Sequence, residues 1–191
     1  SCNTYTWDRA NRLLNMGGVN YNYDGMGNRT RKTVGSIVTD YLLDLQPGLV
    51  VVLGQTVGSD VTRFVHGPRG IHAREANNGD WFWAAQDGLG SVRGEVGNTS
   101  LVAGMRHFGP YGDQLETQPS AYSFMPFAFT GEILDSNALQ FHRARYYSPA
   151  LGTWLSLDPL ETQQNRYSWV KGNVANSTDA NGLQEAIAPP A

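Results

Sequence analysis

Residues 129–160 read FTGEILDSNALQFHRARYYSPALGTWLSLDPL, and this stretch decides the fold of the chain. Turn-forming residues come first, at Gly131, Asp135 and Asn137. An alternating run then follows, with Leu139, Phe141, Arg143 and Arg145 at every second position, before a pair of tyrosines meets a Ser-Pro turn. This spacing predicts a strand, a turn and a second strand.

Length and composition favour the same class of structure along the whole chain. The 191 residues suffice for one sizeable core, and the low charged fraction of 16% with 22 glycines is typical of short strands joined by tight turns. The sequence therefore predicts an all-β fold, a ribbon of consecutive antiparallel hairpins on which the C-terminal third folds back. A net charge of −3 without a basic stripe argues against nucleic acid as a partner, and no apolar run is long enough to cross a membrane.

An internal repeat supports the hairpin ribbon. Residues 5–12 (YTWDRANR) and 21–28 (YNYDGMGN) superimpose at a shift of 16 residues. Alternate aromatic residues lie on one face of a strand, and Asp8 and Asp24 are placed to accept hydrogen bonds from the amides of the following turn. Asn11 and Gly27 tolerate the positive φ that such a turn needs. Two unrelated hairpins of similar composition remain an alternative explanation.

Further elements are predicted from local patterns. The apolar run 49–53 is expected to be buried on both faces or packed in an interface, and the Pro/Gly turn at 66–70 predicts a hairpin. A short helix is expected at 135–140, a loop at 115–127 and an irregular tail at 184–191. Strands are expected at 33–44, 49–53, 61–65, 71–75 and 80–84.

The usual catalytic and metal-binding signals are absent from the sequence. The four histidines have no partner at metal-ligand spacing, no Ser or Cys nucleophile motif occurs, and the single cysteine, Cys2, excludes an internal disulfide. We therefore expect no metal and no cofactor. The chain begins without Met, which is expected of a piece of a precursor or of a longer protein. The histidines are His66, His72, His107 and His142.

The opening stretch closely resembles the signature of the RHS/YD-repeat associated core. In that pattern, F-T-G-x-x-x-D…L-x-x-x-x-A-R-Y-Y-x-P-x-L-G precedes S-x-D-P and N-x-Y-x-Y blocks. Segments 87–93 (DGLGSVR) and 108–112 (FGPYG) resemble further parts of it, so that the resemblance extends nearly to Leu183. It implies a hairpin ribbon at 1–128, the associated core at 129–183 and a tail at 184–191. The matching residues are Gly131, Asp135, Ala144, Arg145, Tyr146, Tyr147, Pro149, Leu151, Gly152, Ser156, Asp158, Pro159, Asn165 and Tyr167.

The resemblance also implies a catalytic pair. Toxin-delivering members of the family, including the C component of Tc toxin complexes and bacterial Rhs effectors, use two carboxylates to cut their own chain after a terminal Gly-Leu. Carried over, the pair is Asp158 with Asp179, and the cut falls between Leu183 and Gln184. The chemistry is that of an aspartic protease, in which one carboxyl stays protonated while the other activates water.

Two arginines are candidates to hold the ionised carboxylate, Arg145 and Arg166. The sequence departs from the family pattern at 160–164, at 173–174 and at 179–180, and eight residues follow the expected cut. These departures predict that self-cleavage is slow or absent at neutral and mildly acidic pH. The alternative interpretation is that both aspartates only cap turns and that Arg143 and Arg145 are strand residues stacked on aromatic rings.

Two classes of function remain open. The first is the core of a secreted or cell-surface polymorphic toxin, a β-scaffold that encapsulates or presents a C-terminal segment or cargo of its parent protein. Two repeats cannot close a hollow container, so the chain would be the end of one or a solid remnant. The second is a self-associating extracellular structural protein, a fibre or ring without cargo. Exposed strand edges predict a homo-oligomer in either case.

Overall fold

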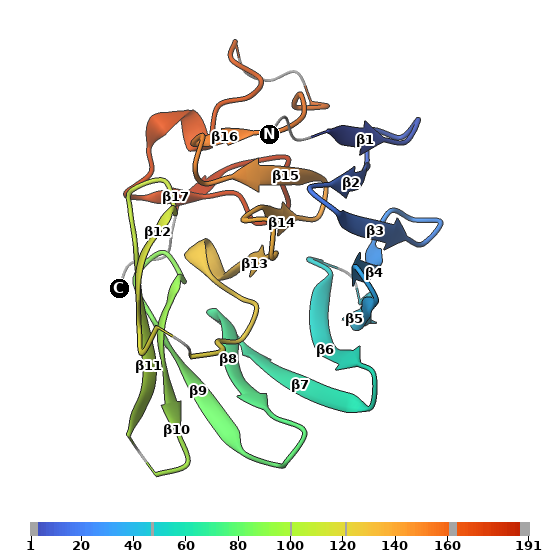
Figure 1. Ribbon diagram of the computed structural model, residues 1–191. Helices are drawn as coiled ribbons and strands as arrows, with labels where there is room; N and C mark the ends of the chain where they lie inside the picture. The colour runs from blue at the N-terminus through green and yellow to red at the C-terminus, as the bar shows by residue number, and fades with distance from the viewer. Residues whose placement is uncertain (1–3, 47, 100, 121, 161–163, 188–191) are drawn as a thin grey trace.

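The computed structural model describes residues 4–46, 48–99, 101–120, 122–160 and 164–187, which form three antiparallel sheets (Figure 1). In the largest sheet every strand pairs with its neighbours in the sequence, so twelve strands form one continuous ribbon of hairpins. This confirms the predicted all-β class. The strands are β1 (Tyr5–Trp7), β2 (Leu13–Met16), β3 (Val19–Tyr23), β4 (Arg29–Val34), β5 (Ile37–Asp44), β6 (Val51–Val57), β7 (Asp60–Gly67), β8 (Gly70–Glu75), β9 (Trp81–Gln86), β10 (Val92–Gly97), β11 (Val102–Phe108) and β12 (Gln114–Gln118).

The turns of the ribbon follow the rule expected from the repeat. Asp8 Oδ1 accepts hydrogen bonds from the amides of Ala10 and Arg12 at 2.9 Å, and Asn11 has a φ of 60°. The turn at Asp24 repeats both features, with a glycine at φ 92°. The same backbone hydrogen bonds close further five-residue turns, which the sequence repeat did not reveal. These turns span 76–80, 87–91, 109–113, 128–132 and 135–139.

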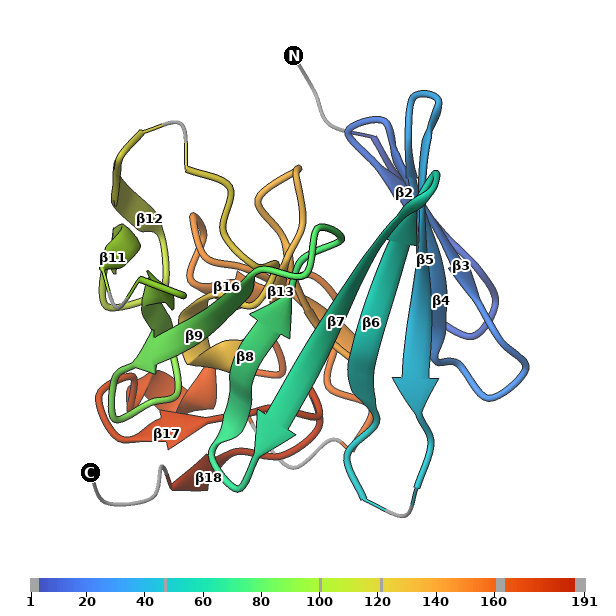
Figure 2. The same cartoon turned by 90° about the horizontal axis from the view of Figure 1, so that it is seen from below.

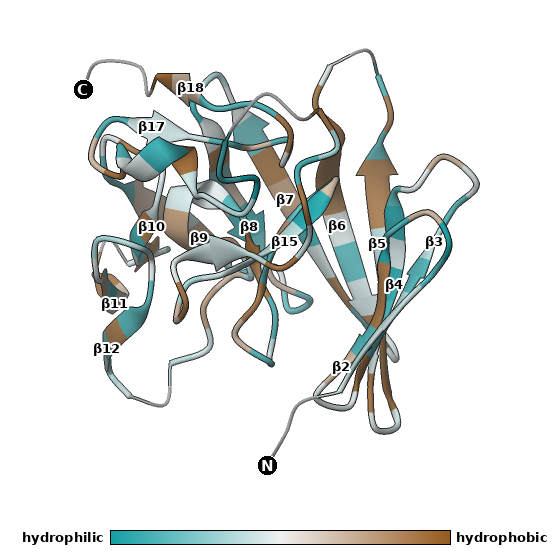
Figure 3. Ribbon diagram, turned by 90° about the horizontal axis from the view of Figure 1, so that it is seen from above, coloured by the Kyte–Doolittle hydropathy of each residue, from teal (hydrophilic) through white to brown (hydrophobic). Residues whose placement is uncertain are grey.

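Several predicted elements of the ribbon need correction. The strand expected at 33–44 is two strands, because Gly35 has a φ of 58° in the turn between β4 and β5. The loop expected at 115–127 begins with β12, which pairs with β11. The run 49–53 is not buried on both faces: β6 is half-buried, with mixed apolar and polar bands (Figure 3), and Leu49 is 43% exposed. The strands expected at 61–65, 71–75 and 80–84 are confirmed as β7, β8 and β9.

A second sheet of four strands is formed by the stretch that begins at residue 129. Every residue of β14 and β15 is buried, so both faces of this sheet are covered by protein. The predicted strand over Leu139–Arg145 is broken by a turn at 143–144, and the helix expected at 135–140 is wrong, because Asp135 begins one of the five-residue turns. The strands are β13 (Ile133–Leu134), β14 (Gln140–His142), β15 (Arg145–Ser148) and β16 (Thr153–Trp154).

The C-terminal segment adds a short hairpin of its own. Part of the expected irregular tail is a strand, because β18 (Ala186–Ile187) pairs with β17 (Ser177–Thr178). Residues 184 and 185 of the predicted tail lie outside any strand, and residues 188–191 lie outside the described residues. Two 3-10 turns complete the structure, η1 (Phe129–Gly131) and η2 (Val170–Gly172). The predicted division of the chain at 128 and 183 stays a prediction.

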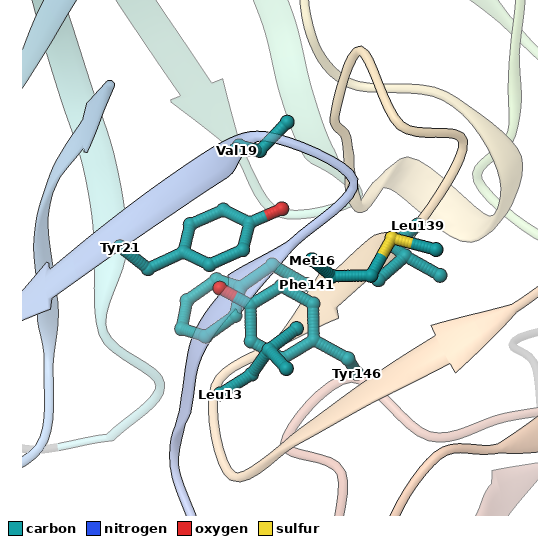
Figure 4. Close-up of a cluster of buried hydrophobic side chains, with 7 residues drawn as sticks. All are labelled: Leu13, Met16, Val19, Tyr21, Leu139, Phe141 and Tyr146. Atoms are coloured by element: carbon teal, nitrogen blue, oxygen red, sulfur yellow. The ribbon is translucent and has the colours of Figure 1, made fainter. Parts of the chain in front are cut away.

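The twelve-stranded sheet curves as an arc around three sides of the second sheet (Figures 1 and 2). Three apolar clusters fill the space between them. One lies between β2, β3 and the second sheet (Figure 4), another under β7, β8 and β10, and a third between β11 and the tryptophans of the C-terminal segment. The C-terminal third therefore folds back and supplies one wall of each cluster. Their buried residues are Leu13, Met16, Val19, Tyr21, Leu139, Phe141 and Tyr146; Phe64, Ile71, Val92, Met125, Phe127 and Ile133; and Phe108, Ala128, Phe129, Tyr147, Trp154, Trp169 and Val170.

Candidate functional site

Arg145 brings together the two aspartates that the sequence singled out. Its Nη2 atom lies 3.2 Å from Oδ2 of Asp158 and 3.3 Å from Oδ2 of Asp179. All three side chains are at most 5% exposed, and the guanidinium stacks on Trp154, 4.2 Å from the ring centre. The first residue of β15 thus holds a carboxylate from the loop after β16 and one from the loop after β17.

Asp158 also organises its own loop. Its Oδ1 accepts the amide of Leu160 at 2.8 Å, as the turn-capping interpretation expected. Arg166, the second predicted arginine, contacts Asp158 through the backbone: its Nε donates to the Asp158 carbonyl oxygen at 3.0 Å, and the Arg166 carbonyl accepts the Asp158 amide at 3.1 Å. Arg166 therefore fixes the loop that carries the carboxylate.

Asp179 contacts the bond at which cleavage is predicted. Its Oδ1 accepts the amides of Leu183 at 3.1 Å and of Gln184 at 3.2 Å, and the second of these belongs to the Leu183–Gln184 peptide bond. Burial raises the pKa of Asp179, and Arg145 and these amides oppose that shift. A buried carboxyl with a raised pKa lies, therefore, at hydrogen-bond distance from the nitrogen that cleavage would release.

The four residues before Leu183 are held by residues 142–145, at the turn between β14 and β15. Each backbone carbonyl from Asp179 to Gly182 accepts a hydrogen bond from the corresponding residue of the segment 142–145, in order along the chain. We refer to residues 142–145 as the carbonyl clamp. Its hydrogen bonds run from His142 Nδ1 to Asp179 O at 2.7 Å, from Arg143 Nη1 to Ala180 O at 2.7 Å, from the Ala144 amide to Asn181 O at 3.2 Å and from Arg145 Nε to Gly182 O at 2.5 Å.

Gly182 allows this close approach. Its φ is 70°, in the left-handed region that favours glycine. A Cβ at this position would overlap the carbonyl oxygen of His142 and lie 3.0 Å from the amide nitrogen of Arg145. The glycine of the Gly-Leu that precedes the predicted cut is therefore required by the packing of segment 179–182 on the clamp.

His142 and Arg143 are site residues that the sequence analysis missed as such. His142 was considered only as a metal ligand, and Arg143 only as a strand residue, whereas Arg143 lies in a turn. Burial lowers the pKa of His142 to about 3, so the ring is neutral and its Nδ1–H donates to the Asp179 carbonyl. No sequence signal marks these contacts, because their acceptors are backbone carbonyls.

A groove of about 540 Å³ opens beside the site. It runs between the turns at 8–12 and 24–28 and the loop before β6, and it reaches Arg145, Pro159 and Leu183. Through Arg145 the groove borders the residue that contacts both buried carboxylates. In the part of the chain that the structure describes, no three His, Cys, Asp or Glu side chains are grouped as metal ligands.

Comparison with known proteins identifies relatives along almost the whole chain, although no family model matches it. The tRNA3(Ser)-specific nuclease WapA of Bacillus spizizenii is 26% identical over 94% of the chain, and the toxin subunit YenC2 of Yersinia entomophaga is 31% identical over 47%. A Photorhabdus luminescens Tc holotoxin pore with a mutated TccC3 component superimposes on 99% of the chain with a TM-score of 0.77 at 22% identity.

The chain spans only 8% of the length of WapA and 10% of YenC2 and of the matched Tc chain. Over the described residues, no helix has the length and hydropathy needed to cross a bilayer. The chain shares its all-β fold with the Tc toxin component, and these sequence relatives together with the matching core signature support an RHS repeat-associated, Tc toxin-like protein.

Proposed function

We propose that the chain is the RHS repeat-associated core of a larger secreted or cell-surface protein, and that it acts as a scaffold that presents a C-terminal segment of its parent. The observation that carries this proposal is the carbonyl clamp, which together with Asp179 fixes six consecutive backbone positions up to Gln184. A segment that only ended the domain would not need its backbone bound residue by residue at a buried carboxylate pair.

The same geometry supports aspartic-type self-cleavage between Leu183 and Gln184. Asp158, as the carboxylate, takes a proton from a water molecule while the oxygen of that water attacks the Leu183 carbonyl carbon. Asp179, as the acid, gives its proton to the Gln184 nitrogen when the C–N bond breaks, and the products are a carboxyl and an amine. The raised pKa of Asp179 favours the acid role.

Arg145 makes this reaction slow at neutral pH. The Arg145 guanidinium lowers the pKa of Asp179 and so stabilises its ionised form, whereas the reaction needs Asp179 protonated. Lowering the pH restores the protonated form of Asp179. We therefore expect cleavage to be slow at neutral pH and faster at mildly acidic pH.

The intact mass of the purified chain tests this proposal. The mass of 20.9 kDa should persist for hours at neutral pH, and residues 184–191 should be lost gradually in mild acid. Asp158→Asn and Asp179→Asn should each stop the loss, while the exposed Asp40→Asn should not. Rapid cleavage at neutral pH, or cleavage that survives both site variants, would falsify the assignment of these roles.

A second candidate function, a self-associating extracellular structural protein, is favoured by the edges of the large sheet. Among the described strands, β1 and β12 each pair on one side only, and Leu115 on β12 is 66% exposed. Such an edge is a template for a further strand, so head-to-tail addition of copies would give a fibre or a ring. Light scattering that shows a monomer mass, unchanged on concentrating, would exclude this function.

A further inference from the structure

We propose that Arg143 is a positioning residue for the C-terminal segment: its guanidinium ties the carbonyl of Ala180 to two other parts of the fold and thereby delivers the amides of Leu183 and Gln184 to Asp179. This inference deepens the proposed presentation and self-processing of the segment and rests on that function.

The contacts of Arg143 join three segments that are far apart in the sequence. Its Nε donates to the carbonyl oxygen of Val50, at the entry to β6, at 3.0 Å. Its Nη1 donates to Ala180 O at 2.7 Å and forms an ion pair with Glu132, which lies just after η1. One side chain thus fixes the start of a ribbon strand, the entry to the second sheet and the segment before the predicted cut.

The backbone of Arg143 shows that the turn itself does not explain this residue. Its φ is 57°, in the left-handed region where a residue with a Cβ is disfavoured. Glycine would form this turn without that cost, so the benefit of arginine lies in its side chain. Backbone strain held in place by surrounding contacts is frequent at functional positions.

Glu132 explains why an arginine is held at this place. The carboxylate of Glu132 is buried, and burial raises its pKa to about 7 despite the opposing effect of Arg143. The positive charge of Arg143 offsets part of the desolvation cost of the ionised Glu132 carboxylate. The same guanidinium also donates an N–H to the Ala180 carbonyl. Lysine could replace the charge but not bond Val50 and Ala180 together.

Arg143 differs in role from Arg145. Arg145 contacts both carboxylates of the predicted reaction, whereas Arg143 contacts only backbone oxygens and Glu132 among the described partners. Arg143 would act through Asp179, by fixing Ala180, the residue that follows Asp179 in the chain. Loss of Arg143 should therefore loosen the segment without altering the chemistry of the carboxylates.

Amide hydrogen exchange of the full chain, resolved by residue with NMR, tests this inference. Arg143→Gln should speed the exchange of the Leu183 and Gln184 amides by at least about tenfold, the factor that corresponds to about 1.4 kcal/mol. Amides of the core, such as that of Val92, should keep their rates. Arg143→Lys, which retains the charge, should give a smaller local increase. The matched control is Arg63→Gln, which removes an exposed ion pair and should leave the segment unchanged.

The outcomes separate this inference from the proposed function. A local increase in exchange without any self-cleavage at acidic or neutral pH supports the positioning role and refutes self-processing. An increase below twofold at both amides overturns the inference. If exchange rises equally in the core, or if both variants at position 143 lose their structure, Arg143 stabilises the whole fold and the inference is wrong.

Discussion

The buried ion pair between Arg29 and Asp135 should be the polar contact whose loss costs the fold most. Arg29, on β4, lies 2.5 Å through Nη1 from Oδ2 of Asp135, and the two side chains are 1% and 0% exposed. Lys32 adds a second contact to the same carboxylate at 3.2 Å. The pair thus joins the ribbon to the turn between β13 and β14. We expect Asp135→Asn to separate these two parts of the molecule.

The cost follows from the burial of the cation. Removing one partner of a buried pair costs about 3–5 kcal/mol, because the remaining charge stays desolvated without compensation. Phe141, whose ring centre lies 4.3 Å from the Arg29 guanidinium, offsets part of this desolvation cost through a cation–π contact. Since a domain is stable by about 5–15 kcal/mol in total, the variant should lose a large share of its stability.

Denaturation with urea, followed by tryptophan fluorescence, measures the difference. The matched control is Asp40→Asn, which breaks the pair with Arg31 on the same ribbon. Both side chains of that pair are about half exposed, at 48% and 49%, so its loss should cost about 0–1 kcal/mol. If Asp135→Asn costs no more than Asp40→Asn, the reasoning from burial is refuted.

Three further predictions concern the second sheet and the site. Tyr146→Ala or Tyr147→Ala should each cost about 3–5 kcal/mol and give insoluble or protease-sensitive protein, because both rings are buried in apolar clusters; normally folded variants that lose only a partner would contradict this. Gly182→Ala should expose residues 179–184 to limited proteolysis, because its Cβ overlaps the clamp; wild-type resistance there would contradict the role of the glycine. The pKa of Glu132 is raised from 4.5 to about 7, so between these pH values the folded chain binds more protons than the unfolded chain, and the free energy of unfolding falls as the pH rises. Glu132→Gln should flatten this pH dependence, measured by urea denaturation. An unchanged dependence would contradict the shift.

The ribbon could be predicted because each of its turns is determined by a few consecutive residues. An aspartate followed three residues later by a residue that tolerates positive φ forms the same turn at Asp8 and at Asp24, whatever lies further along the chain. Other copies were missed: the turn at 87–91 begins with an aspartate but lies outside the two repeats that superimpose, and the turn at 76–80 uses the same backbone hydrogen bonds with an alanine at the first position. The geometry is more general than the motif that revealed it.

The second sheet was harder to predict because both of its faces are covered. A strand with one exposed face alternates apolar and polar residues, whereas β14 and β15 bury glutamine, histidine and arginine along with tyrosine. The turn at Arg143 was hidden for the same reason, since a basic residue in an alternating run predicts an exposed strand position. Local propensity also failed at 135–140, where contacts of Asp135 with the ribbon favour a turn over a helix.

Within the site, the contacts between charged side chains could be predicted from the sequence, whereas the contacts with backbone groups could not. A charged residue can be recognised in a sequence by its type and its position in a motif. The resemblance to a known signature was therefore enough to select Arg145, Asp158 and Asp179. The structure brings these side chains together, although Arg145 and Asp179 are 34 residues apart in the sequence. The carbonyl clamp has no such signal, because carbonyl acceptors exist at every residue and the register of two segments decides which are used. Only Gly182 is specific, since no other residue fits its φ and the space beside it. The clamp therefore places few demands on the side chain at position 180, so that this residue can differ from the family pattern while its carbonyl is still held by Arg143.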